Sequence, residues 1–358
     1  MRAAEFARQR PPQAKLMVID ACGRISHAAR AGFADYLRAG DLVIANDAAT
    51  LPASLHGRHE ASGAAIELRL AGQRSFAAKD FGQFSAILFG AGDYRTDAEN
   101  RPAPPPVAAG ERLMFGPLIA TVQAVLGHPR LLALRFAGTA DEIWAGLAHH
   151  GRPIQYAHVP APLALWDVWT PIAGLPVAFE PPSAGFLLDW QALADLRERG
   201  IQFATITHAA GISSTGDRQL DRRLPFAEPY RIPAATAAAI RQARTRGRRI
   251  IAIGTTVVRA LEHAASRAGA RGAVRAGDGV ADQRIGSQTG LRVVDAILSG
   301  THEADTSHFQ LLRAFTDDES LARANAELEA RAYRTHEFGD SVLIERRDFV
   351  NCAAAGWR

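Results

Sequence analysis

The sequence is poor in cysteine and has no long hydrophobic run, and both absences exclude classes of protein. Only two of its 358 residues are cysteines, Cys22 and Cys352, which excludes a disulfide-stapled scaffold and a four-cysteine zinc site. We therefore expect a reducing, cytoplasmic environment. No stretch approaches the roughly 20 apolar residues of a membrane-spanning helix. The first ten residues lack the apolar core of a secretory signal, so we expect no membrane partner.

Lysine is also scarce. Of the 41 lysine and arginine residues only Lys15 and Lys79 are lysines, so 39 are arginines, and the formal net charge is +4. Arginine makes bidentate contacts to phosphate and carboxylate groups, but an alanine- and arginine-rich genomic composition explains the same bias. The charge therefore permits nucleic-acid binding without demonstrating it.

The order of the expected elements predicts two domains, which the length of the chain also favours. Between residues 54 and 138, short apolar runs are separated by glycine and proline, as is typical of a small β-barrel. After residue 150, expected strands alternate with expected helices, which favours a mostly parallel sheet with flanking helices. We therefore expect an α/β domain formed by residues 1–53 and 139–358, with an inserted β-barrel-like domain at 54–138.

Several local patterns make narrower predictions. The spacing predicts a helix over 33–38, a strand over 291–298, and an exposed extended loop in the proline-rich segment 101–107. Thr139 is an expected N-cap, because Glu142 three residues later completes a capping box.

The segment 250–259 carries the most informative local pattern. A buried strand leads into Gly254, and Thr255 and Thr256 begin a helix. Free backbone amides and the helix dipole favour an anion or carboxylate there. Arg259 follows Thr256 by about one helical turn, so both side chains can face one ligand. A glycine turn with a threonine N-cap explains the same residues without a ligand.

Other residues capable of chemistry follow expected strands. Asn46 and Asp47 end an early strand, and His208 and His302 each follow a later one. In open α/β sheets, ligands bind beyond the carboxyl ends of the strands. An Asx turn explains the first pair equally well, and a lone histidine is often structural. Glu228 stands in a proline-bounded loop, where solvation is the simplest expectation.

Several established motifs are absent. The sequence has no GxGxxG after a strand, no P-loop, no HExxH and no GxSxG. The pair His149 and His150 lacks the spacing of metal ligands, so we expect no metal site.

The order of these segments resembles one family, the S-adenosylmethionine:tRNA ribosyltransferase-isomerases of queuosine biosynthesis. The resemblance covers about residues 35–345 and is weakest across the β-rich insert. The matching segments, in chain order, are 40–47 (GDLVIAND), 51–57, 182–185 (PSAG), 232–247, 250–262 (with GTTVVRALE), 293–296 (VVDA), 298–315, 333–334 and 339–340.

The departures from the family pattern concern histidines. Leu187 and Phe226 stand where the family has histidine, which removes two proton carriers and hydrogen-bond donors. Glu228 and Tyr230 match the family's glutamate and one of its tyrosines, and His302 aligns with the histidine of its NFHLP segment.

The resemblance implies transfer and isomerisation of the ribosyl group of S-adenosylmethionine onto 7-aminomethyl-7-deazaguanine in tRNA, which gives epoxyqueuosine and releases adenine and methionine. S-adenosylmethionine is a substrate, and no metal is required. The implied proton-transfer residues are Glu228, His208 and His302. The implied substrate-binding residues are Asn46, Asp47, Gly185, Tyr230, Gly254, Thr255, Thr256, Arg259 and Asp295. We expect a monomer.

Two further interpretations stay open from the residues. The loss of two motif histidines and the low lysine content favour a diverged enzyme that uses S-adenosylmethionine, or a related nucleoside, with another acceptor. A non-catalytic ligand-binding protein built on the same fold is the third interpretation.

Overall fold

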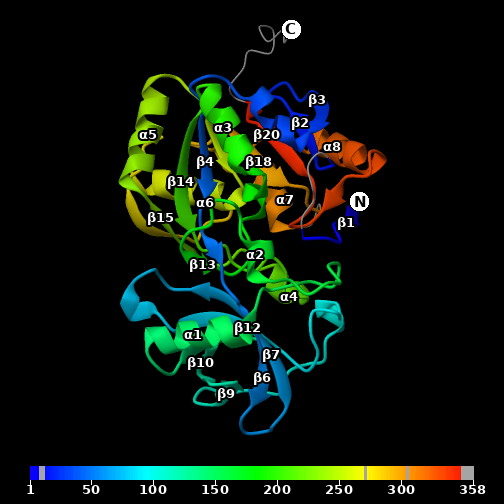
Figure 1. Ribbon diagram of the computed structural model, residues 1–358, viewed down its shortest axis with the longest axis vertical. Helices are drawn as coiled ribbons and strands as arrows, with labels where there is room; N and C mark the ends of the chain where they lie inside the picture. Colours follow the sequence, from blue (N-terminus) through cyan, green and yellow to red (C-terminus); the bar gives the residue numbers. More distant parts are fainter. Residues whose placement is uncertain (8–12, 270–271, 304–305, 348–358) are drawn as a thin grey trace.

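We describe a computed structural model of the chain, which places residues 1–7, 13–269, 272–303 and 306–347 (Figure 1). One part contains a nine-stranded sheet. Its strands, in spatial order, are β17 (Gly277–Ala281), β15 (Glu228–Ile232), β14 (Gln202–His208), β4 (Leu42–Asn46), β16 (Ile250–Ile253), β18 (Ala296–Gly300), β20 (Ser341–Glu345), β2 (Lys15–Ile19) and β3 (Ile25–Ala29).

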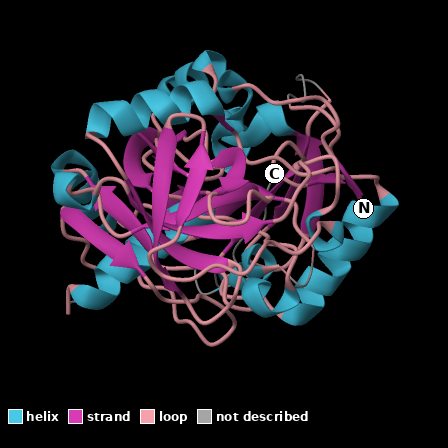
Figure 2. Ribbon diagram, turned by 90° about the horizontal axis from the view of Figure 1, so that it is seen from below, coloured by secondary structure: helices cyan, strands magenta, loops and turns pink. Residues whose placement is uncertain are grey.

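The central strands of this sheet are buried on both faces, which explains their continuous apolar sequences. Successive side chains of a strand point to opposite faces. In β4, Leu42 and Ile44 pack on one face and Val43 and Ala45 on the other. The first face is covered by α5 (Ala234–Thr245), α6 (Thr255–Arg267), α7 (Ser307–Leu312) and α8 (Asp318–Ala330), and the second by η1 (Arg30–Tyr36) and α3 (Trp190–Glu198). Seen from below, the helices surround the strands (Figure 2).

The other part of the molecule is a closed barrel, drawn at the bottom of Figure 1. Its antiparallel strands, in spatial order, are β6 (Ser54–His59), β7 (Ala65–Gln73), β8 (Gln83–Phe89), β11 (Leu131–Phe136), β10 (Leu118–Val125) and β9 (Arg112–Phe115), and a β6–β9 pairing closes the ring. Helix α1 (Ala140–His150) packs Ile143 and Leu147 against the same apolar core. The short strand β12 (Gly151–Arg152) pairs with β6.

Short elements complete the described chain. They are β1 (Arg2–Ala3), which pairs with β19 (Arg334–Thr335); β5 (Ala49–Thr50), which pairs with β13 (Pro176–Ala178); α2 (Leu165–Val168); α4 (Arg218–Asp221); η2 (Ala78–Asp80); η3 (Ala98–Asn100); and η4 (Ser183–Leu187). None of the described helices combines the length and hydrophobicity that crossing a bilayer requires.

The expected class, an α/β fold with an inserted barrel, is confirmed, and so is the capping box of Thr139 and Glu142. The large sheet is more mixed than expected. The pairings β14–β4, β4–β16, β16–β18 and β20–β2 are parallel, whereas β17–β15, β15–β14, β18–β20 and β2–β3 are antiparallel. The predicted domain boundaries, residues 1–53 and 139–358 against 54–138, stay predictions.

Three local predictions are corrected. The segment expected as helix 33–38 is the 3-10 turn η1, and the strand expected over 291–298 begins at Ala296. Glu228 does not lie in a solvated loop. It begins β15, and only 5% of its surface is exposed. The loop prediction failed because this segment, although it contains proline, forms a strand that pairs with β14 and β17.

Candidate active site

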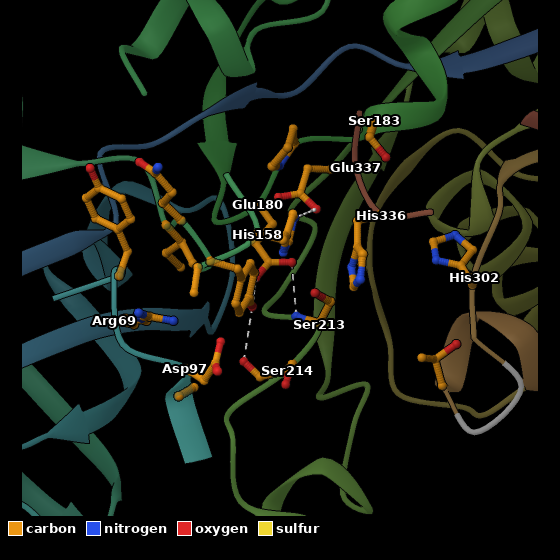
Figure 3. A pocket seen from close by; sticks show the side chains of 18 of the residues that line it. Arg69, Asp97, His158, Glu180, Ser183, Ser213, Ser214, His302, His336 and Glu337 are labelled. Atoms are coloured by element: carbon orange, nitrogen blue, oxygen red, sulfur yellow. Dashed lines mark hydrogen bonds and ion pairs between the residues drawn. The ribbon is translucent and has the colours of Figure 1, made fainter. Parts of the chain in front are cut away.

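Two adjoining cavities lie beyond the carboxyl ends of β14, β16 and β18, where ligands bind in open α/β sheets. The first cavity, about 400 Å³, lies between barrel residues, including Arg69, and loops of the α/β part (Figure 3). The second, about 280 Å³, lies beside α6 and the start of β15. Both contain Ser213 and His308 in their linings. Small-molecule sites have volumes of roughly 300–1,000 Å³, so the joined cavities have room for a nucleoside-sized ligand.

A buried ion pair forms the floor of the second cavity. The Arg259 guanidinium bonds Glu228 Oε2 through Nη1, and its Nη2 donates to the carbonyl oxygens of Phe226 (3.1 Å) and Ala281 (2.8 Å). Glu228 Oε1 accepts from the Gly211 amide at 2.6 Å. A side chain at Gly211 would place its Cβ 2.7 Å from this oxygen, so the close approach requires glycine. Burial raises the pKa of Glu228, while Arg259 and the Gly211 amide oppose that rise.

His208 lies behind this ion pair. It is fully buried at the end of β14, and its Nε2 is 3.5 Å from Glu228 Oε2. Burial, and secondarily the positive charge of Arg259, holds the pKa of His208 well below its usual value, so the ring is neutral. Asn46 fixes the His208 backbone, because its Oδ1 accepts the His208 amide and its Nδ2 donates to the His208 carbonyl oxygen, both at 2.9 Å.

Helix α6 presents its amino terminus to the second cavity. Its N-cap is Gly254, with φ +95°, a conformation that L side chains rarely adopt. No side chain caps the helix, so the threonine N-cap considered from the sequence is not formed. Thr255 and Thr256 line the cavity. The first amides of the helix are therefore available to an anionic group of a ligand.

Glu180 gives the first cavity a carboxyl group with an unusual pKa. Its Oε1 accepts the Tyr156 hydroxyl at 2.5 Å, and its Oε2 accepts the Ser213 amide at 3.0 Å. Burial raises the pKa of Glu180 to about 7, with a smaller contribution from Glu337. A carboxyl group that titrates near neutrality is suited to accept or give a proton.

Four histidines also line the first cavity, in two stacked pairs. The rings of His302 and His308 are 4.5 Å apart. The rings of His158 and His336, which Figure 3 labels, are 4.3 Å apart. Burial lowers the pKa of His308 to about 4 and holds that of His302 well below its usual value. Both rings are therefore neutral at physiological pH.

The structure brings part of the predicted set together. Glu228, Thr255, Thr256 and Arg259 line the second cavity, and His302 lines the first. The side chains at the two positions where the resemblance implies histidine are apolar. Phe226 packs on the barrel core and Leu187 on the core beside α3.

The remaining predicted residues line neither cavity. Asp47 accepts the Thr207 hydroxyl at 2.7 Å, and Gly185 packs against Thr170. The Tyr230 hydroxyl lies 2.9 Å from His263 Nδ1, away from both cavities. Asp295 accepts the Ile250 amide at 2.8 Å and pairs with Arg244. Ile250 begins β16, whereas Gly254 follows the end of this strand. Asp295 therefore lies at the amino-terminal end of β16, opposite to the end at which the cavities lie.

The residues of the first cavity that the sequence did not single out are Arg69 in β7, His308 in α7, and His158, Glu180, His336 and Glu337 in loops. Glu180 stands three residues before Ser183 of the PSAG segment, which was the only nearby signal. Arg69 contacts Glu67 Oε1 through Nε at 2.7 Å, and its buried Nη1 has no hydrogen-bond partner.

Comparison with known proteins places the chain in a family. The profile of the family described as "Queuosine biosynthesis protein" matches residues 2–344. The S-adenosylmethionine:tRNA ribosyltransferase-isomerase of Sorangium cellulosum is 35% identical over 370 residues, and that of Citrifermentans bemidjiense 32% over 354 residues, each with 95% of both chains covered. A crystal structure of S-adenosylmethionine tRNA ribosyltransferase from Thermotoga maritima has a TM-score of 0.48 and 24% identity, covering 96% of this chain and 95% of that one. By the profile match and the full-length relatives, the chain belongs to the queuosine biosynthesis protein family, the family of the S-adenosylmethionine:tRNA ribosyltransferase-isomerases.

Proposed function

We propose that the protein transfers and isomerises the ribosyl group of S-adenosylmethionine onto 7-aminomethyl-7-deazaguanine in tRNA, giving epoxyqueuosine and releasing adenine and methionine. Full-length similarity to the ribosyltransferase-isomerases supports this reaction. The observation that carries it in the structure is the pair of adjoining cavities, which share Ser213 and His308. One can hold a sulfonium nucleoside while the other, between the barrel and the sheet, admits the acceptor base.

The second cavity is the proposed site of S-adenosylmethionine. The free amides at the start of α6, with Thr255 and Thr256, suit its methionine carboxylate. Arg259 contributes indirectly, because its guanidinium is committed to Glu228 and to backbone carbonyl groups. We therefore assign Arg259 to hold Glu228 in place, and Asn46 to hold His208.

Proton transfer is proposed for the carboxyl and imidazole groups that face the ligand. The reaction needs a base for a ribose proton that the adjacent sulfur makes acidic. Glu180, with a pKa of about 7, is suited to that step, and Glu228 is the carboxylate on the side of α6. The neutral ring of His308, which lines both cavities, can hydrogen-bond the departing adenine, and the neutral ring of His302 stacks on it in the first cavity. Arg69 Nη1 offers a donor to the acceptor.

The macromolecular partner in this proposal is tRNA, and its contacts are expected to involve phosphate. With 39 arginines and a net charge of +4, the protein should lose affinity for tRNA as the salt concentration rises. We infer that it acts in the cytoplasm, where tRNA is modified, and we retain the prediction of a monomer.

The test is the release of adenine from S-adenosylmethionine, measured by chromatography with and without tRNA that carries the deazaguanine base. Release that depends on this tRNA is expected. Release with the unmodified tRNA, or with none, would contradict the proposed acceptor. Saturable binding of S-adenosylmethionine without any release would point to a binding protein.

A further inference from the structure

Three side chains from distant parts of the chain converge in the first cavity. His158 lies in the loop after β12, and His336 and Glu337 lie between β19 and β20. Each offers one ligand atom, and these atoms all lie within 4.8 Å of one another (Figure 3). All three side chains are partly exposed to the cavity rather than sealed in the core.

One nitrogen of this cluster makes no hydrogen bond. His158 Nε2 is buried and lies 3.4 Å from Glu337 Oε2, at ion-pair distance but without the geometry of a hydrogen bond. The His336 ring stacks on the His158 ring at an angle of 23°. A buried polar nitrogen without a hydrogen bond costs free energy, so the arrangement is more favourable with a ligand for this atom.

The backbone holds His336 in an uncommon conformation. Its φ is +68°, one of two positive values among the described residues other than glycine, and its carbonyl oxygen accepts the Gly339 amide at 2.9 Å. Left-handed conformations outside glycine are concentrated at functional sites. Here that conformation presents the imidazole and the following carboxylate to the same cavity.

We propose that His158, His336 and Glu337 bind one divalent transition-metal ion of the zinc class. Two imidazoles and one carboxylate are ligands that Zn²⁺, Fe²⁺ and Co²⁺ accept, whereas Mg²⁺ and Ca²⁺ prefer oxygen ligands. Metal–ligand bonds of roughly 2.0–2.2 Å place ligand atoms about 3–4 Å apart. Small side-chain rotations would therefore bring the three ligand atoms to the distances that one ion requires. The remaining coordination positions face the cavity, where water or an oxygen atom of a ligand can fill them.

This ion is an addition to the ribosyl transfer, for which the family resemblance implies no metal. The proposal therefore does not rest on the proposed function. Glu180 stays outside the ligand set, because both of its oxygen atoms already accept hydrogen bonds from Tyr156 and Ser213.

The experiment uses the full chain, stripped with a chelator and titrated with Co²⁺ alone. Visible absorption and calorimetry measure Co²⁺ binding. Displacement of Co²⁺ by Zn²⁺ shows that the two ions bind the same site. The variants His158→Gln, His336→Gln and Glu337→Gln should each weaken Co²⁺ binding at least about 10-fold, since even loss of a group that only supports a ligand costs 10–100-fold. The matched control is His128→Gln, because His128 Nε2 also faces a carboxylate, Asp217 Oδ2 at 3.3 Å, and should leave binding unchanged.

Two outcomes would overturn the proposal. One is a triple variant, folded by circular dichroism, that binds Co²⁺ as tightly as the unchanged protein. The other is loss of binding in His302→Gln or His308→Gln while His158→Gln still binds. If the variants do not fold, electron paramagnetic resonance of the unchanged protein with Cu²⁺ decides, because coupling to two imidazole nitrogens is expected and any other number contradicts the set.

Discussion

The two cavities differ in how the chain builds them. The second is made from residues at strand and helix ends, and its main charges, Glu228 and Arg259, neutralise each other in a buried pair. The first is assembled mostly from loops of both parts of the molecule. Its Glu180 carboxyl group accepts hydrogen bonds from neutral donors and has a pKa of about 7.

This difference separates residues that hold the site in place from residues that can transfer a proton. A charge that is paired inside the protein holds its neighbours in place, but it is less available to a substrate. A carboxyl group whose pKa is near neutrality is available for proton transfer. We therefore assign anchoring of S-adenosylmethionine to the second cavity and proton transfer chiefly to the first, and the following changes test that division.

The largest effect is expected from Arg259→Ala. It leaves Glu228 buried without its counter-charge, which should lower the free energy of unfolding by about 3–5 kcal/mol, measured by urea denaturation. The control is Arg231→Ala, since Arg231 pairs with Asp278 at 2.6 Å on the surface and should cost at most about 1 kcal/mol. The double variant Arg259→Met/Glu228→Gln should recover most of the loss. Equal losses in the variant and the control would contradict the positioning role.

The next effect is the loss of turnover in Glu180→Gln. Removing a general base typically lowers the rate about 100- to 10,000-fold. In the unchanged protein the rate of adenine release should rise with pH through about 7, where the pKa of Glu180 lies, and the variant should lose this rise. Measurement in the presence of a chelator keeps any bound cation from shifting the profile. An unchanged rate and profile would remove Glu180 from the mechanism.

The same variant has a stability signature. Because burial raises the pKa of Glu180 from 4.5 to about 7, the folded state holds a proton that the unfolded state releases between these values. The contribution of Glu180 to stability should therefore fall as the pH rises from 4.5 to 7, whereas buried histidines with lowered pKa values, such as His308, contribute a rise over part of this range. The stability of the unchanged protein relative to Glu180→Gln should therefore decrease from pH 4.5 to 7, as followed by urea denaturation at several pH values. A stability difference between the two proteins that does not change with pH would contradict the raised pKa.

Asn46→Ala should have a moderate effect. It removes the acceptor of the His208 amide and one of the donors to the His208 carbonyl oxygen, which keeps the Ala210 amide, and an unsatisfied buried group costs about 1–3 kcal/mol. The free energy of unfolding and the KM for S-adenosylmethionine should distinguish a structural role from the binding role predicted from the sequence. A raised KM at unchanged stability would restore the binding role.

The smallest effect is expected from Tyr156→Phe. The Tyr156 hydroxyl lowers the pKa of Glu180 by donating to it, so its loss should move the rise in the pH–rate profile to higher pH. The maximal rate should change little, because Glu180 keeps the Ser213 amide as a donor. A shift toward lower pH would contradict this hydrogen bond.

The sequence predicted the elements better than their directions. Strands such as β4 and β16 are buried on both faces, so their apolar runs are visible in the sequence. The antiparallel β18–β20 pairing joins segments separated along the chain, and no local pattern reports its direction. Glu228 was misjudged for a similar reason, because its burial depends on α6 and on β17.

The part of the candidate site that the sequence predicted lies at the ends of regular strands and helices. Thr255, Thr256 and Arg259 could be placed together because helical periodicity fixes their spacing. His158, Glu180 and His336 could not, since they lie in loops whose paths are set by packing between the barrel and the sheet. Their pKa values depend on distances and burial that only the folded structure supplies.

The most direct test of the division compares Thr256→Val in the second cavity with Glu180→Gln in the first. For each folded variant, calorimetry gives the affinity for S-adenosylmethionine, and a single-turnover assay with the deazaguanine tRNA gives the rate of adenine release. We predict that Thr256→Val binds S-adenosylmethionine more weakly, while Glu180→Gln binds it normally and releases adenine at least about 100-fold more slowly. Normal binding by Thr256→Val together with normal release by Glu180→Gln would contradict the account.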